Sequence, residues 1–583
     1  MTILSSLARA YDRLPDAPKP GLSLQKIGLV VGLNPDGTIA SVTDWRDGEG
    51  KKRQPRPMPV PQPVKRASNI LPNSFWDKTA YSLGVKVDPG PRTALEHRAF
   101  VDHHRALLAG TEDEGLLAFL RFLEFWRPEM FEAAGFTEDM KDQNVVFALE
   151  SERRRNVFLF DRLAARALIE APPDRKAETA LCLVTGRRGP IARLHPSIKG
   201  VWGGQSAGAS IVSFNLDAFE SYGHVQGDNA PVSQAAASAY VGALNHFLTK
   251  DSGHRIQIGD ASTVFWAEAA DAQAAAMSES VFAAMFADEP IDTTGDTRRV
   301  GDILERIRKR LPLHEVAPEL CAGVRFHILG LAPNAARISV RFWLEDEFGA
   351  IVSHYARLWQ EMRVEPADPG GAPPLWQYLA ETAARGKSDN VPPNLAGEWM
   401  RAILAGSRYP MTLLSTLLMR IRADGHVTSR RVSMLKALVI RNYHLEKEAP
   451  VALDPENPNR GYLLGRLFAA YEFAQTGALG RNVNATIKDK FYGSASVQPQ
   501  KVFRMLDAGS VNHLAKIGKE RPGQRVNIEK AIAAIMDRMD PNDDPFPPTL
   551  SAAEQALFGL GYYHQRSAFL ARKEAPTEEP AAS

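Results

Sequence analysis

The pattern of apolar residues in this 583-residue chain changes near residue 400. Before that point, short β-branched runs alternate with turns, whereas from Glu398 onward apolar residues recur at the spacing of an amphipathic helix. Strands and helices have different apolar periods, so the change indicates a separate helical bundle after residue 400. The sequence predicts an α+β fold: a mixed α/β amino-terminal region over residues 1–400, an α-helical bundle over 401–573, and a disordered tail over 574–583.

Several elements can be predicted within the first region. Residues 27–31 and 39–42 flank the turn sequence Asn-Pro-Asp-Gly and predict a β-hairpin. Prolines at every second position from 55 to 63 exclude a helix and favour an extended, polyproline-like segment. Residues 92–170 have helical apolar spacing. A further helix is expected near 232–248, and a β pair at 324–329 and 337–343. In the carboxy-terminal region, helices are expected at 399–404, 413–421, 433–441, 462–476, 526–538 and 552–558.

Composition restricts the function only weakly. Apolar residues make up 44% and charged residues 24%, which is ordinary for a soluble protein. The net charge is only +2, so any binding of nucleic acid must come from local clusters. The two cysteines, Cys182 and Cys321, are too few for a disulfide framework or a cysteine-rich zinc site, and we expect reduced thiols. No metal or other cofactor is predicted.

The sequence predicts neither an export signal nor a membrane span. The start, MTILSSLARAYDRL, predicts a short amphipathic helix and lacks the apolar core of a signal peptide. No run of 18 apolar residues occurs, so no membrane span is predicted. We expect a cytoplasmic protein.

Two short motifs resemble catalytic sites. Residues 204–208 match the G-x-S-x-G nucleophile elbow, which needs a strand before the serine and a helix after it. A β-like run at 211–214 follows instead, so we predict a glycine-rich binding loop or a structural turn. Asp102-His103-His104 lies in a predicted helix, where adjacent residues point to different faces, and no second cluster supports a metal site. A nuclease with a site around Asp102 remains a distant alternative.

A stretch of basic and amide side chains next to the proline run favours contact with DNA. Ser and Asn can hydrogen-bond base edges, Lys and Arg can contact phosphates, and prolines stiffen the loop that presents them. We predict that base edges are read by Lys65, Arg66, Ser68, Asn69 and Asn73. Phosphate contacts are expected from Lys51, Lys52 and Arg53, for which solvated loop charge is the alternative. Trp76 is expected in the core.

Two further regions favour contact with a nucleic-acid strand. Between residues 401 and 448, nine Lys and Arg residues stand against three Asp and Glu residues. A groove for single-stranded DNA or for an RNA-bound neighbouring subunit would explain them, and a solvated helix face is the alternative. Residues 203–268 mix glycines with hydroxyl, amide and aromatic side chains, a pattern typical of polymer-contacting loops. The predicted backbone or strand contacts in these regions are Gln205, Ser206, Asn215, Arg420, Arg430 and Arg431. Arg466, which extends the basic character further along the bundle, is predicted as a contact as well.

Several motifs along the chain resemble one known family. They are SFN (213–215), AFESYG (218–223), NAP (229–231), VFWA (264–267), RASNILPN (66–73), WDKTAYSLG (76–84), YLLGRLF (462–468), FYGSAS (491–496) and GYYHQR (561–566). In this order and spacing they resemble the large subunit of the type I-C CRISPR surveillance complex (Cascade), the Csd-type family. The resemblance covers nearly the whole chain.

The resemblance implies a non-catalytic DNA-binding subunit of an RNA-guided antiviral complex. In that family the amino-terminal domain recognises the protospacer-adjacent motif in double-stranded target DNA, and the subunit aids duplex opening and supports the displaced single strand. The implied partners are the guide RNA ribonucleoprotein, the backbone and foot subunits of Cascade, a helicase–nuclease effector, and a small subunit translated from within the same gene, here from Met434 or Val451. The alternative is an interaction scaffold that binds guide RNA and sister subunits without reading the motif.

Overall fold

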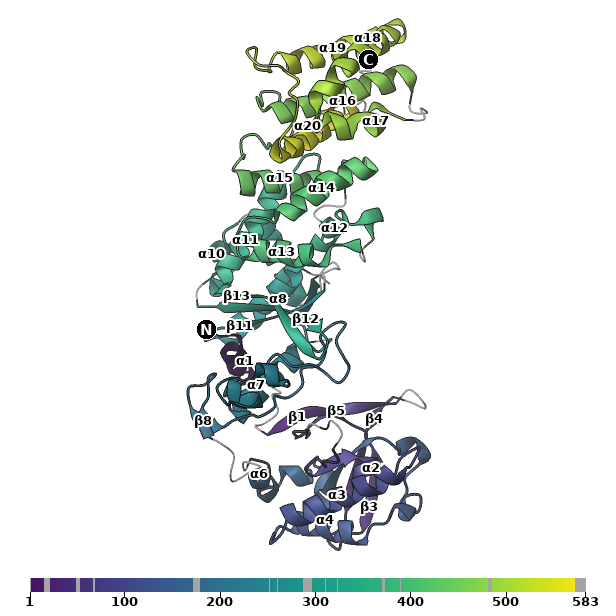
Figure 1. Ribbon diagram of the computed structural model, residues 1–583, viewed down its shortest axis with the longest axis vertical. Coiled ribbons are helices and arrows are strands. Elements are labelled where there is room, and N and C mark those ends of the chain that lie inside the picture. The colour runs from purple at the N-terminus through teal and green to yellow at the C-terminus, as the bar shows by residue number, and fades with distance from the viewer. Residues whose placement is uncertain are drawn as a thin grey trace, which may run out of the picture. The chain divides into compact units, whose positions relative to one another are not determined.

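The chain folds into two compact units (Figure 1). Unit 1 comprises Met1–Gly200, Gly204–His246 and Asn334–Ile338, and unit 2 comprises Val201–Gly203, Phe247–Pro333 and Ser339–Ser583. A computed structural model describes residues 2–14, 21–48, 53–64, 66, 69–170, 179–250, 252–258, 260–286, 296–309, 311–321, 323–369, 373–387, 390–480 and 485–571. The sheets lie in the amino-terminal part of the chain and helices form its carboxy-terminal part, so the predicted α+β fold class is confirmed.

The centre of unit 1 is a four-stranded sheet. Its order is β3 (Ile39–Asp44), β2 (Leu29–Leu33), β7 (Asn144–Leu149) and β6 (Trp76–Lys78). The predicted hairpin is confirmed: β2 pairs antiparallel with β3, and the turn between them is closed by the N–H of Asn34 on the carbonyl of Thr38 at 2.9 Å.

Strand β7 corrects one part of the sequence analysis, because it lies inside the stretch predicted as helical. It runs parallel to β2 and pairs with β6 on its other side, and its residues Val145 to Leu149 are all buried, so both of its faces are covered. A strand buried on both faces has a continuous apolar run instead of an alternating one, and such a run is hard to distinguish from a buried helix.

Helices cover the sheet of unit 1, and α4 (Glu114–Phe125) packs directly on β2 and β7. Its Phe119 and Phe122 rings lie 4.9 and 5.4 Å from the ring of Phe147 on β7. The Asp113 carboxylate caps this helix by accepting the N–H of Leu116. The other helices of this part are α2 (Thr79–Ser82), α3 (Pro91–Leu107), α5 (Glu150–Arg153) and α6 (Leu163–Glu170).

The alternating prolines form a strand. A second sheet has the order β1 (Leu22–Ile27), β5 (Gln54–Pro61) and β4 (Arg46–Asp47), and β1 and β5 pair antiparallel. Alternate residues of a strand hydrogen-bond toward opposite neighbours. Prolines at every second position therefore remove donors from one side of β5 only, and the intervening residues keep their N–H groups for β1. The predicted extended conformation is confirmed, but as a paired strand and not as a polyproline helix.

The remainder of unit 1 is largely irregular. It contains α1 (Ile3–Tyr11), which the sequence predicted, α7 (Gln234–Phe247) and the small pair β8 (Thr179–Leu181) and β9 (Arg188–Pro190). Short 3-10 helices occur at Pro128–Met130, Glu138–Met140, Leu159–Asp161, Asp217–Phe219 and Gln226–Asn229. Between β9 and α7 the chain is held mainly by isolated bridges and side-chain hydrogen bonds, so this loop-rich region can present polar groups.

Unit 2 begins with a four-stranded antiparallel sheet. Its order is β10 (Arg255–Ile258), β11 (Ala261–Glu268), β12 (Arg325–Asn334) and β13 (Arg337–Glu347). Strands β12 and β13 are the predicted β pair. The helices that accompany the sheet are α8 (Ala272–Phe286), α9 (Asp296–Arg308), α10 (Leu313–Val316), α11 (Phe348–Met362) and α12 (Leu375–Ala380), with 3-10 turns at Pro318–Leu320 and Ala384–Gly386.

In the remainder of unit 2, the described residues form helices and the loops between them. The helices are α13 (Pro393–Leu404), α14 (Met411–Asp424), α15 (Ser429–Tyr443), α16 (Arg460–Leu479), α17 (Ile487–Ala495), α18 (Pro499–Glu520), α19 (Pro522–Met536) and α20 (Ala552–Ala571). The predicted boundary near residue 400 falls inside unit 2, whose apolar core continues from Leu358 on α11 to Leu438 on α15. The division into separate domains there stays a prediction, and residues 574–583 lie outside the described residues.

The structure bears on the two cysteines and on the question of a membrane-spanning helix. Cys182 is buried and Cys321 is half-buried, and neither is in a disulfide. In the part of the chain that the structure describes, no helix combines the length and apolar character needed to cross a bilayer.

Candidate nucleic-acid interface

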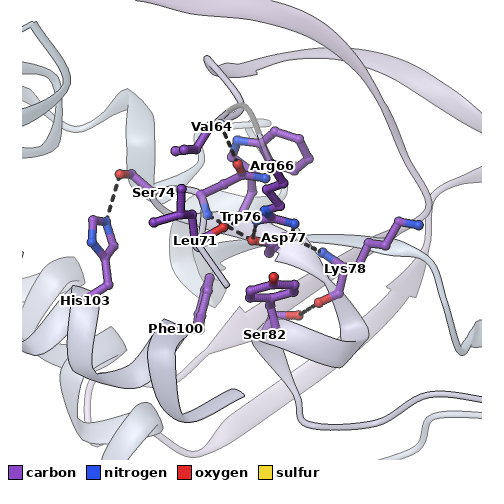
Figure 2. A network of polar contacts seen from close by, with 12 residues as sticks. Val64, Arg66, Leu71, Ser74, Trp76, Asp77, Lys78, Ser82, Phe100 and His103 are labelled. Atoms are coloured by element: carbon purple, nitrogen blue, oxygen red, sulfur yellow. Dashed lines mark hydrogen bonds and ion pairs between the residues drawn. The ribbon is translucent and has the colours of Figure 1, made fainter. Parts of the chain in front are cut away.

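The loop between β5 and β6, here called the Arg66 loop (residues 62–75), is organised by one guanidinium group (Figure 2). Arg66 forms a two-pronged ion pair with the carboxylate of Asp77, and its Nη1 lies 3.0 Å from Asp77 Oδ1. Its Nε–H donates to the carbonyl of Leu71, and the guanidinium carbon lies 4.0 Å from the centroid of the Tyr81 ring. The loop is therefore tied at its base to β6 and α2.

Asp77 is the buried acceptor of this network, with a side chain that is 1% exposed. Burial raises the pKa of its carboxyl, while the ion pair with Arg66 acts in the opposite direction. The backbone N–H groups of Asn73 and Lys78 also donate to it, at 2.9 and 2.8 Å. A carboxylate that is out of water and paired on several sides holds Arg66, Asn73 and Lys78 in one arrangement.

Asn73 has a bracing role that the sequence did not predict. Its side chain is buried, and its Oδ1 accepts the N–H of Val64 at 2.9 Å across the loop. Trp76 is buried as predicted, and its indole N–H donates to the carbonyl of Pro61 at 2.8 Å. In this conformation the amide of Asn73 joins the two ends of the Arg66 loop and is not presented for base reading.

Other groups of the Arg66 loop do face solvent. Asn69 is exposed and Leu71 is 39% exposed, and Lys78 at the end of the following strand β6 is exposed as well. Lys65 and Ser68, which were predicted to read bases, lie outside the described residues. The geometry thus combines an exposed tip, which includes Asn69, with a rigid buried base.

The Asp-His-His motif has a structural role beside this loop. His104 is fully buried; its Nε2 accepts the N–H of Phe75 at 2.8 Å, and its Nδ1 lies 2.8 Å from the carbonyl of Phe100. Burial lowers the pKa of His104 to about 3, so the ring is neutral. Nε2 of His103 lies 3.1 Å from Oγ of Ser74 (Figure 2). Among the described residues, no group of three or more His, Cys, Asp or Glu side chains could hold a metal ion.

A second surface of unit 1 is the Tyr222 turn, residues 221–229. Tyr222 is 99% exposed and adopts a φ of +52°, and Gly223 follows at +79°. A bridge between Ser221 and His224 closes this two-residue turn. Left-handed backbone costs a residue with a side chain about 1–2 kcal/mol, so the surrounding contacts must hold it in place.

Asn229 provides those contacts for the Tyr222 turn. Its Oδ1 accepts the N–H of Ser221, and its Nδ2 donates to the carbonyls of His224 and Gln226, all at 3.0 Å. His224 also contacts the carboxylate of Asp228 at 2.7 Å. The result is a preorganised turn that carries a solvent-facing aromatic ring.

The glycine-rich stretch before this turn is a loop. Residues 204–208 have no strand before and no helix after Ser206, so the geometry of a nucleophile elbow is lacking there. Gln205 and Ser206 are both exposed. Asn215 accepts a hydrogen bond from Arg337 at 2.7 Å, and the same guanidinium lies 4.2 Å from the centroid of the Phe219 ring.

Four basic residues of α14 and α15, namely Arg420, Arg430, Arg431 and Arg441, form ion pairs within unit 2. Arg431 is buried and contacts Asp424 at 2.6 Å and Glu381 at 2.9 Å. Arg420 also pairs with Asp424 at 2.9 Å. Much of the local positive charge is thus neutralised inside the unit, and Arg431 is not presented to a strand in this conformation.

Three other residues that were predicted to contact a nucleic-acid strand also have partners within the protein. Arg430 is partly exposed and lies 2.8 Å from Asp368. Arg466 is buried, which lowers its pKa, and it donates to Gln565 at 3.1 Å. In unit 1, Arg53 pairs with Asp44 at 2.7 Å and is 40% exposed, while Lys51 and Lys52 lie outside the described residues. Strand contacts by Arg53, Arg420 and Arg430 stay predictions.

The sequence analysis did not identify Tyr222 or Arg337 as candidates. The signal for Tyr222 was weak, because Tyr-Gly is not among the dipeptides that favour a two-residue turn with positive φ. Arg337 begins β13 and is distant in sequence from Asn215, so only the folded chain reveals their contact.

A family model described as CRISPR-associated protein (Cas_Csd1) matches residues 7–570, nearly the whole chain. No curated protein matches the chain.

Proposed function

The chain belongs to the Cas_Csd1 family of CRISPR-associated proteins, and from this we propose that it is the DNA-recognition subunit of a type I-C Cascade complex. It would read the protospacer-adjacent motif in duplex DNA, help to open the duplex and support the displaced strand. Base pairing between guide RNA and target would supply the remaining sequence specificity. The subunit itself would be non-catalytic and would provide the platform for a helicase–nuclease.

The observation that carries this proposal is the Arg66 loop. Reading a base edge requires donors and acceptors held in fixed positions, because each misplaced group loses its hydrogen bond. The buried pair between Arg66 and Asp77 and the brace from Asn73 fix the base of the loop. The exposed amide of Asn69 can then contact a groove, and the exposed ammonium of Lys78 can contact a phosphate.

The Tyr222 turn supports the proposed handling of unpaired DNA. Aromatic rings that face solvent stack on unpaired bases of any identity. Asn229 fixes the backbone that carries the ring, so little backbone conformational entropy is lost when a base stacks on it.

Replacing Asn69 by Ala tests the motif-reading proposal. In the complex assembled with guide RNA, we expect affinity for a duplex with the preferred motif to fall by about 1–3 kcal/mol, since one base-reading side chain is lost. Binding to a scrambled motif and the melting temperature should stay unchanged. The preferred motif is first selected from a randomised library, and both duplexes are then compared by gel shift.

Asn73→Ala is the comparison variant, because it removes an amide of the same kind from a buried position. We expect it to destabilise unit 1 by about 1–3 kcal/mol and to weaken motif binding through loss of the loop conformation. Equal losses on correct and scrambled motifs for Asn69→Ala would contradict motif reading. That result would favour the alternative of an interaction scaffold that does not read the motif. The internal contacts of Arg431 and Arg466 are consistent with that alternative, because they leave these two side chains unavailable to a DNA strand.

A small subunit translated from within the gene is a further expectation. Expression of the unmodified gene should give a second product of about 14–17 kDa, a domain-sized fragment that contains α16 to α20. A start at Val451 would remove α15, which packs against α11 and α20, whereas a start at Met434 would keep residues 434–443 of that helix. Mass spectrometry identifies the start. Synonymous recoding of the upstream ribosome-binding sequence should remove this product alone, and its persistence would show that it arises by proteolysis.

A further inference from the structure

Unit 2 contains a cavity of about 880 Å³ beside the helix α15. Its walls come from the end of α9, from α11 and α12, from one face of α15, and from the chain before α16. The volume lies within the range of small-molecule sites, about 300–1,000 Å³. No part of the Arg66 loop or the Tyr222 turn contributes to it.

One face of α15 lines this cavity with polar side chains. Arg430, Ser433 and Lys436 follow one another at intervals of three residues and therefore point to the same side of the helix. Arg430 is paired with Asp368 at 2.8 Å, so its charge is compensated at the rim. Ser433 and Lys436 are both buried.

Lys436 is the most unusual of these groups, with only 3% of its surface exposed. Its Nζ donates to the backbone carbonyl of Glu361 at 3.1 Å. The Glu361 carboxylate is already occupied by Arg441 at 2.8 Å, Arg357 at 2.8 Å and the hydroxyl of Tyr409 at 3.0 Å. A buried ammonium is costly unless an anion accompanies it, and no carboxylate among the described residues forms an ion pair with Lys436.

A second cation enters the cavity from α9. The guanidinium of Arg308 lies 5.3 Å from the centroid of the Trp359 ring and 3.4 Å from the hydroxyl of Tyr355. Its Nε is buried and has no hydrogen-bond partner in the described part of the chain, which also provides no carboxylate within ion-pair distance. Two cations and a serine hydroxyl thus face one cavity with unused capacity for an anion.

The aromatic side chains in the cavity wall favour a ligand that has a flat ring as well as a negative charge. Trp359 and Tyr378 both line the cavity, and their ring centroids lie 6.0 Å apart at an interplanar angle of 68°. Flat aromatic walls next to cations match the two parts of a nucleotide, a base that stacks and a phosphate that carries charge.

We propose that this cavity binds a phosphorylated nucleotide, with the phosphate toward Lys436, Arg308 and Ser433 and the base toward Trp359. The same chemistry could come from a free mononucleotide or from the phosphorylated end of a nucleic-acid strand. The proposal is independent of motif reading, because the cavity shares no residue with the Arg66 loop.

The test is equilibrium binding to the purified full-length protein, measured by calorimetry. The probes are the four nucleoside 5′-monophosphates, their nucleosides, inorganic phosphate, and a short oligonucleotide with either a 5′-phosphate or a 5′-hydroxyl. We expect phosphorylated probes to bind at least tenfold more tightly than their unphosphorylated counterparts. Tighter binding of monophosphates than of the 5′-phosphorylated strand would identify a free nucleotide as the ligand. Tighter binding of the 5′-phosphorylated strand would identify a strand end as the ligand.

Two variants connect binding to the cavity. Lys436→Met keeps the length of the buried side chain and removes its charge, and Arg308→Gln removes the other cation. Each should weaken binding of phosphorylated probes at least tenfold. Arg504→Gln, at an exposed ion pair on α18, should leave binding unchanged. Melting curves identify any variant that fails to fold, and Trp359→Phe then replaces it, with an expected loss for nucleotides but not for inorganic phosphate.

Either of two results would overturn the proposal. One is that no phosphorylated probe binds the wild-type protein at millimolar concentration. The other is that binding occurs but is equally strong in the folded cavity variants and in Arg504→Gln. Neither result affects the Asn69→Ala test, which reports on unit 1.

Discussion

Substitution of Gly465 by Ala is expected to separate helices α16 and α20 and to destabilise the helical part of unit 2 by about 3 kcal/mol or more. A methyl group on Gly465 would lie 2.0 Å from the carbonyl oxygen of Phe558 on α20. Likewise, a methyl group on Gly561 of α20 would lie 2.1 Å from the carbonyl oxygen of Tyr462 on α16. Backbone atoms cannot rotate aside as side chains do, so the helix axes themselves must move apart.

Two further glycine variants test whether this close contact between α16 and α20 causes the loss of stability. Gly561→Ala should resemble Gly465→Ala, because each glycine faces the backbone of the other helix. Gly509→Ala is the control: it lies within α18, nothing lies within 4 Å of the added methyl, and the change should stabilise the helix by about 0.5–1 kcal/mol. Thermal melting and hydrogen exchange of α16 and α20 measure the effect. A Gly465→Ala protein that melts like the wild type would show that the helices are not in this close contact.

The fold class could be predicted because it depends on local patterns. The hairpin of β2 and β3 follows from turn residues between two apolar runs, and the helices of unit 2 follow from apolar spacing. Strand β7 could not be predicted in this way, since its apolar run depends on being covered on both faces. The glycines at 461 and 465 are visible in the sequence, but their partner helix α20 is not.

The candidate site was less predictable, because burial and pairing decide the role of each polar residue. Asn69 and Asn73 are the same residue type four positions apart, yet one is exposed and the other joins the ends of the loop. The positive charge near α15 has a similar explanation. Arg431 finds one of its partners, Glu381, far away in the sequence, so composition alone could not show that its charge is internal.

Removal of the Arg66 guanidinium is expected to have the second large effect. Arg66→Met would leave the buried Asp77 carboxylate without its counter-ion, and breaking a buried ion pair typically costs about 3–5 kcal/mol. The Arg66 loop should lose its fixed conformation as a result. Hydrogen exchange of residues 73–79 reports this locally, and motif binding by the assembled complex should weaken as well.

The dependence of this loss on pH distinguishes an ion pair from simple packing. Burial already raises the pKa of Asp77, and removal of Arg66 would raise it further. Above the unfolded pKa of an acid, the folded state of such a variant binds more protons than the unfolded state, so its stability increases as the pH falls. The deficit of Arg66→Met relative to wild type should therefore shrink between pH 7 and pH 5. In Asp77→Asn the side chain at this position cannot ionise, so the stability deficit of this variant relative to wild type should not shrink between pH 7 and pH 5. A deficit of Arg66→Met that is the same at both pH values would mean that Arg66 acts through its packing on Tyr81 and not through its charge.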